Sequence, residues 1–119
     1  MKIQELLICK GINLERTRLI RHNLSNEEIA AYYVRGQIET YQTIQRPSRF
    51  RNCDYVISFL GTEGTNGVFL GCYKVNGYSE FDASKLPSDF TIGLDTNTDC
   101  VIFHLEETNV LEEFKNRLV

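Results

Sequence analysis

The chain has 119 residues, a formal net charge of −3, and hydrophobic and charged fractions of 42% and 24%. This length fits a single domain, and this composition excludes a wholly disordered chain. The charge is unevenly placed: residues 1–60 carry nine Lys and Arg, seven of them Arg, against six acidic residues, whereas residues 61–119 carry four against ten. We therefore expect a bipolar surface if the two halves occupy different faces, with arginines available to bind phosphates or carboxylates.

The first half of the chain predicts helices around one strand. Residues 2–10 have the apolar spacing of a short helix that ends at Gly11, and residues 16–22 alternate like a strand. Ser25 followed by Glu28 matches the capping box that begins a helix. Helical spacing then continues to Gly36 and resumes over residues 37–45, before Pro47 ends it.

The second half predicts strands. Residues 54–60 and 67–75 form a hairpin in this interpretation, and the Asn76-Gly77 turn returns the chain as a further strand over 78–81. Two more strands follow at 90–95 and 100–106, and a terminal helix is predicted over 110–117. The whole pattern indicates an α+β fold, in which helices pack on a small curved mixed or antiparallel sheet or an open β-barrel.

The cysteines are too far apart for a CxxC zinc or redox motif. They are Cys9, Cys53, Cys72 and Cys100. We expect free thiols in a reducing, cytoplasmic environment, and no cofactor or metal. The apolar stretch at residues 6–9 is far too short for a signal peptide or a membrane span, so no membrane partner is expected.

Motifs of catalysis are missing, since the sequence contains no HExxH, phosphate-binding loop or nucleophile elbow. The remaining candidate is a surface that combines charge with aromatic rings. Its centre is the loop around Arg46, Arg49, Phe50, Arg51 and Asn52. Arginine binds phosphates and phenylalanine stacks on bases, which favours a nucleic-acid surface. In the alternative interpretation, Phe50 is a core residue and the arginines are solvated or paired with acidic residues.

Arg16 and Arg18 extend this surface if the strand over 16–22 lies beside the loop. Nucleic-acid binding then predicts that five arginines converge beside an open pocket. They are Arg16, Arg18, Arg46, Arg49 and Arg51.

Several segments resemble the N-terminal domain of certain bacterial GIY-YIG-type nuclease proteins. They are FRNCDYVISFLG at 50–61, VFLGCYKV at 68–75, RLIRH at 18–22, YVRG at 33–36 and ETYQ at 39–42. Neither the GIY and YIG tripeptides nor the catalytic Arg, Tyr and Glu of the nuclease can be placed in the chain. The resemblance therefore implies a target-recognition domain, either a stand-alone relative or the N-terminal fragment of a larger nuclease protein.

The strand–glycine–strand pattern is also similar to PUA-like folds. That resemblance implies a concave, partly aromatic pocket that holds a nucleotide or a modified base. Its candidate lining residues are Phe50, Asn52, Tyr55, Phe59 and Tyr73. Strand alternation places Tyr55, Ile57 and Phe59 on one face, which is equally typical of a hydrophobic core.

The leading hypothesis is a DNA-recognition domain associated with a GIY-YIG-type endonuclease. One alternative is a protein-interaction or structural module, which predicts an exposed apolar patch. The other is a small-ligand or nucleotide sensor, which predicts a closed pocket without a basic rim.

Overall fold

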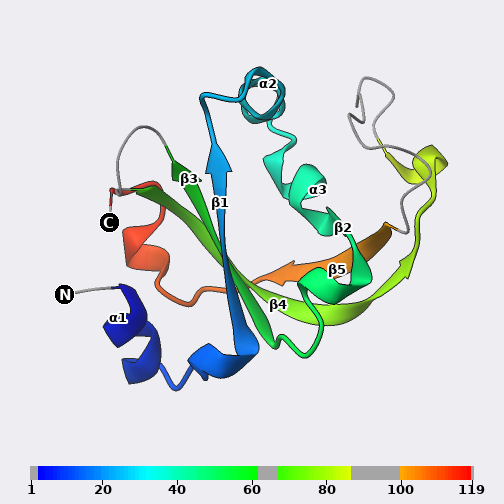
Figure 1. The fold of residues 1–119 in the computed structure, drawn as a ribbon. Coiled ribbons are helices and arrows are strands. Elements are labelled where there is room, and N and C mark those ends of the chain that lie inside the picture. Colours follow the sequence, from blue (N-terminus) through cyan, green and yellow to red (C-terminus); the bar gives the residue numbers. More distant parts are fainter. Residues whose placement is uncertain (1–2, 62–66, 87–99, 119) are drawn as a thin grey trace.

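A computed structural model describes residues 3–61, 67–86 and 100–118 of the chain (Figure 1). Within these residues lie three short helices and five strands. They are α1 (Ile3–Cys9), β1 (Thr17–Asn23), α2 (Glu27–Val34), α3 (Ile38–Thr43), β2 (Ile44–Gln45), β3 (Tyr55–Gly61), β4 (Gly67–Glu80) and β5 (Val101–Glu107). The expected α+β fold with helices packed on a curved sheet is confirmed.

The strands form one mixed sheet in the order β1-β3-β4-β5-β2. β1 runs parallel to β3, and the other neighbours are antiparallel. The sheet curls through 233° into a half-barrel. β1 and β2 are therefore the two edges of a sheet that bends back toward itself.

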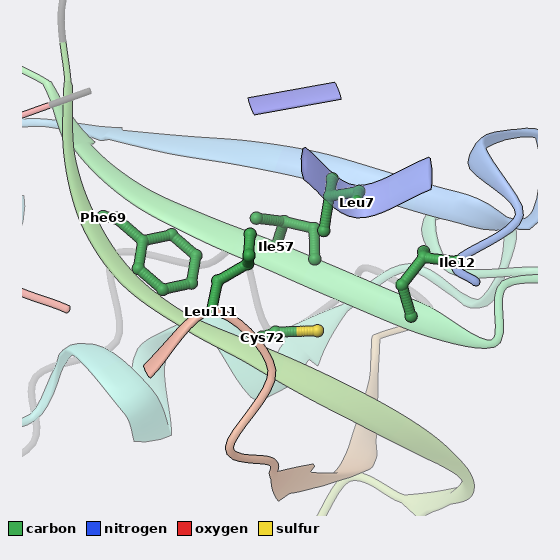
Figure 2. Close-up of a cluster of buried hydrophobic side chains, with 6 residues drawn as sticks. All are labelled: Leu7, Ile12, Ile57, Phe69, Cys72 and Leu111. Carbon is green, nitrogen blue, oxygen red and sulfur yellow. The ribbon is translucent and has the colours of Figure 1, made fainter. Parts of the chain in front are cut away.

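One face of the sheet is covered by α1 and by the segment that follows β5. Leu7 of α1 and Leu111 pack against Ile57, Phe69 and Cys72, as Figure 2 shows. Each of these five side chains is buried, so this cluster is the centre of the hydrophobic core. The apolar face of β3, which carries Tyr55, Ile57 and Phe59, lies in this cluster.

Two further clusters lie elsewhere in the fold. Ile20 of β1 and Val56 of β3 pack with Phe50 and Phe103. Around α2 and α3, a third cluster gathers buried Tyr32, Ile38 and Ile44. The segment at 37–45 is thus a short helix that leads directly into β2. In β2, Ile44 pairs with Ile102 at the edge of the sheet.

The cap of α2 differs from the expected capping box. Asn26 is the N-cap, and its side-chain oxygen accepts hydrogen bonds from the backbone N–H groups of Glu28 and Ile29 at 3.0 and 3.3 Å. Ser25 instead donates its hydroxyl to Asn23 at 2.8 Å. Asparagine caps helices as well as serine does, so Ser25 and Asn26 are both suitable caps in the sequence, and the helix begins after Asn26.

The Asn76-Gly77 pair does not form a hairpin. β4 continues through it from Gly67 to Glu80, and the pair sits where the register against β5 shifts between Val75 and Tyr78. Gly77 has a φ of +91°, which accommodates the irregularity without reversing the chain. The expected separate strand over 78–81 is therefore the second half of β4.

The expected terminal helix over 110–117 is also wrong. The structure has a single 3₁₀ turn, Glu112–Phe114, between Leu111 and Asn116, whose φ values are +57° and +63°. Hydrogen bonds between this segment and Phe69 replace helical ones, since the Phe69 N–H donates to the Arg117 carbonyl and the Asn116 N–H donates to the Phe69 carbonyl. The strand expected over 90–95 lies outside the described residues.

Candidate nucleic-acid interface

The loop between β2 and β3 carries half of the candidate residues, and Phe50 anchors it. The Phe50 ring is 2% exposed and meets Phe103 edge to face, with 5.0 Å between ring centroids. Its neighbours Arg49 and Arg51 are exposed. Burial of one ring thus holds the loop while the flanking guanidinium groups remain in solvent. Phe50 is a core residue and offers no free face for stacking.

An open cavity of about 940 Å³ lies against this loop. We name it the aromatic cavity, and its lining is Arg46, Pro47, Ser48, Phe50, Arg51, Asn52, Cys53, Val75, Gly77, Tyr78 and Phe103. Tyr78 is 57% exposed, and its ring centroid lies 5.4 Å from that of Phe103. The accessible aromatic ring of this cavity is therefore Tyr78, which was not among the residues selected from the sequence.

A second open cavity, of about 460 Å³, adjoins the first. We name it the seam cavity, because its lining takes Arg18 from β1 and Ile44 and Gln45 from β2, the two edges of the curled sheet. The rest of its lining is Arg46, Ser48, Arg49 and Cys100. Arg46 and Ser48 line both cavities. The strand over 16–22 and the loop therefore do contribute to one surface.

Four of the five candidate arginines lack a carboxylate partner among the residues that the structure describes. They are Arg18, Arg46, Arg49 and Arg51. Arg16 differs, because its guanidinium donates two hydrogen bonds to Asp54, at 2.9 and 3.0 Å. This pairing lowers the pKa of the Asp54 carboxyl. Arg16 is thus satisfied within the protein, whereas no described carboxylate pairs with the other four guanidinium groups.

Three of the proposed pocket residues lie away from these cavities. Tyr55 and Phe59 pack against the core cluster under α1. Tyr73 is buried, and its hydroxyl donates to a carboxylate oxygen of Glu39 at 3.1 Å. Burial, reinforced by the Glu39 charge, raises the pKa of Tyr73. Of the expected pocket residues, only Phe50 and Asn52 line the aromatic cavity.

A buried polar network lies close to Arg49. His22 Nε2 is 3.2 Å from both the Gln42 side-chain oxygen and the Ser58 hydroxyl, and the Tyr41 ring meets the imidazole edge-on. Burial lowers the pKa of His22, and the positive charge of Arg49 adds to this effect. The imidazole is therefore held neutral beside the basic surface. The side chains of residues 21–23 alternate between the two faces of the strand, as expected. No local sequence pattern indicates that His22 contacts Gln42.

Other kinds of site find no support in the described ranges 3–61, 67–86 and 100–118. No group of three or more His, Cys, Asp and Glu side chains there is placed to hold a metal ion. None of the helices seen in those ranges is long and apolar enough to cross a membrane.

Comparisons of the chain with models of protein families, with curated proteins and with solved structures found no match. Any function assigned to the chain therefore rests on its own side chains and their geometry.

Proposed function

We propose that this chain is a DNA-binding domain that holds its ligand on the loop before β3. The observation that carries this proposal is the set of four arginines around two adjoining open cavities, without a carboxylate partner among the described residues. Guanidinium groups bind phosphate oxygens through paired N–H donors. Phosphate contacts supply most of the affinity and position a protein on a nucleic acid.

The aromatic cavity supports a base beside these phosphate contacts. Tyr78 exposes its ring there, and Asn52 provides an amide that can donate to and accept from a base edge. Stacking of one base on one aromatic side chain contributes about 1–3 kcal/mol. Such a cavity lies within the size range of small-molecule sites, so it has room for an unpaired or flipped base.

The alternatives have less support. Among the described residues, the exposed large hydrophobic side chains belong to several different elements. They are Ile8, Leu19, Tyr33, Val34, Tyr78 and Leu118. A sensor was expected to have a closed pocket without a basic rim, whereas exposed arginines line both cavities. The resemblance to domains of GIY-YIG-type nuclease proteins extends our proposal: the domain would direct a nuclease to its target.

Fluorescence anisotropy tests this function. Short labelled DNA duplexes, plain and cytosine-modified, and the matching single strands are titrated with the protein at low and moderate salt. We expect affinity to fall with salt, and the double variant Arg46→Ala/Arg51→Ala to bind at least about tenfold more weakly. Arg117→Ala is the matched control, because Arg117 is exposed and lies near the start of β4, next to the end of β3 opposite the loop.

Absence of binding to every DNA at low salt would refute the proposal. Equal weakening by the double variant and by Arg117→Ala would refute the assignment of the surface.

A further inference from the structure

The seam cavity gathers positive charges that no carboxylate among the described residues pairs with. Its guanidinium groups come from two directions: Arg18 from β1, and Arg46 and Arg49 from the loop that follows β2. β1 and β2 stand at opposite ends of the strand order, and both edges of the curled sheet contribute to the lining of this one cavity.

Three like charges around one cavity repel one another unless an anion lies between them. Arg18, Arg46 and Arg49 have no carboxylate partner among the described residues, whereas nearby Arg16 is bound to Asp54. The remaining lining offers a hydroxyl from Ser48 and one N–H of the Gln45 amide, whose nitrogen also donates to the Gln42 carbonyl at 3.2 Å. The cavity is therefore built for an anion with several acceptor oxygens.

The number of guanidinium groups distinguishes two kinds of phosphate. An internal phosphodiester carries one negative charge and two free oxygens. A terminal phosphomonoester carries about −1.5 to −2 charges at pH 7 and three acceptor oxygens. Three arginines and two neutral donors around one cavity match the monoester better than the diester.

The neighbouring cavity supplies the second half of the argument. Arg46 and Ser48 line both cavities, so a group held in the seam cavity lies beside the cavity that Tyr78 and Phe103 line. A phosphate joined through a sugar to a base requires that juxtaposition of a basic and an aromatic subsite.

We propose that the seam cavity binds the terminal phosphomonoester of a nucleic-acid strand while the terminal base enters the aromatic cavity. This inference rests on the proposed DNA binding and makes it specific for strand ends. A free nucleoside monophosphate presents the same chemistry, and the experiment distinguishes the two sources.

The test uses single-stranded oligonucleotides of one sequence with a 5′-phosphate, a 3′-phosphate or hydroxyl ends, each labelled at the opposite end from the one compared. We expect one phosphorylated end to increase affinity by about tenfold or more, because its phosphate forms charge-assisted hydrogen bonds that a hydroxyl end cannot form. Arg18→Ala/Arg49→Ala is expected to weaken binding of every strand but to weaken phosphorylated ends further, so that the preference disappears, because Arg18 and Arg49 line the seam cavity and not the aromatic one.

Arg18→Lys/Arg49→Lys keeps both charges and is expected to retain part of the preference; thermal unfolding of each variant verifies that it folds. Equal affinity for phosphorylated and hydroxyl ends overturns the inference and leaves DNA binding intact. Absence of wild-type binding to every strand refutes both proposals. Titration with a free nucleoside monophosphate separates the sources: binding of this ligand with no binding of phosphorylated strands overturns the assignment to strand ends.

Discussion

Arg16 and Asp54 join the starts of two parallel strands. Arg16 Nε lies 2.9 Å from Asp54 Oδ2, and Nη2 lies 3.0 Å from Oδ1. The backbone N–H of Asp54 also donates to the Arg16 carbonyl at 2.7 Å. Immediately afterwards, Thr17 pairs with Tyr55 as β1 and β3 begin. The side-chain pair thus lies at the point where the β1–β3 pairing begins, and it occupies the Arg16 guanidinium.

Arg16→Ala is therefore expected to leave DNA affinity nearly unchanged while slightly lowering the melting temperature. The pair is solvent-exposed, and exposed ion pairs contribute little to stability. Anisotropy titration and thermal unfolding, side by side with Arg49→Ala, make the comparison. A loss of affinity as large as that of Arg49→Ala would show that the pair opens to admit a phosphate.

Tyr78→Ala is expected to weaken binding of single strands by about tenfold, because it removes the exposed ring of the aromatic cavity and stacking contributes about 1–3 kcal/mol per base. Tyr78→Phe keeps the ring and is expected to bind like the wild type. Tyr33→Ala is the control, since Tyr33 is a similarly exposed tyrosine on α2. Anisotropy at one salt concentration is sufficient. Wild-type affinity of Tyr78→Ala would exclude stacking at this position.

The fold was largely predictable from local patterns, because strands such as β3 and β5 are short apolar runs bounded by turn residues. The errors arise where tertiary contacts outweigh local signals. Asn76-Gly77 has the composition of a hairpin, but β5 pairs with β4 on both sides of it. The apolar spacing at 110–117 suits a helix, but Phe69 offers backbone hydrogen bonds that hold the segment against β4 instead.

The site was predictable only in part for a similar reason. Arg46, Arg49 and Arg51 are neighbours in the sequence, so their loop was found directly. Tyr78 and Phe103 come from strands that the sheet brings to the loop, and the sequence gives no measure of that distance. The same holds for the seam cavity, whose existence depends on how far the sheet curls. Phe50 shows the converse, because an aromatic residue among arginines has the pattern of a stacking residue and yet packs in the core.

Gly77→Ala is expected to destabilise the fold by about 1–2 kcal/mol, because Gly77 has a φ of +91° and side chains are strained there. No atom would clash with an added Cβ, so the loss measures backbone strain alone. Gly77→Asn should lose less, since asparagine tolerates positive φ better than alanine. Guanidinium chloride unfolding gives both values. Equal stability of wild type and Gly77→Ala would mean that the backbone at this position adjusts without cost.

His22 predicts a pH dependence of stability. Its folded-state pKa is lowered, chiefly by burial, so the unfolded chain binds this proton more readily than the folded protein does. The contribution of His22 to stability is therefore complete above the unfolded pKa of about 6.5 and is lost as the pH falls through the folded value. The groups that face the imidazole are the Gln42 amide, the Ser58 hydroxyl, the Tyr41 ring and the Arg49 charge.

His22→Gln removes this titration, so the difference in unfolding free energy between pH 7 and pH 5 should be smaller than in the wild type, whatever the absolute stability of the variant. Denaturant unfolding at several pH values measures that difference. His104→Gln is the comparison variant, because it makes the same replacement at an exposed histidine on β5. Parallel profiles for His22→Gln and the wild type would place the acid sensitivity in other groups and would contradict a neutral His22 in the folded protein.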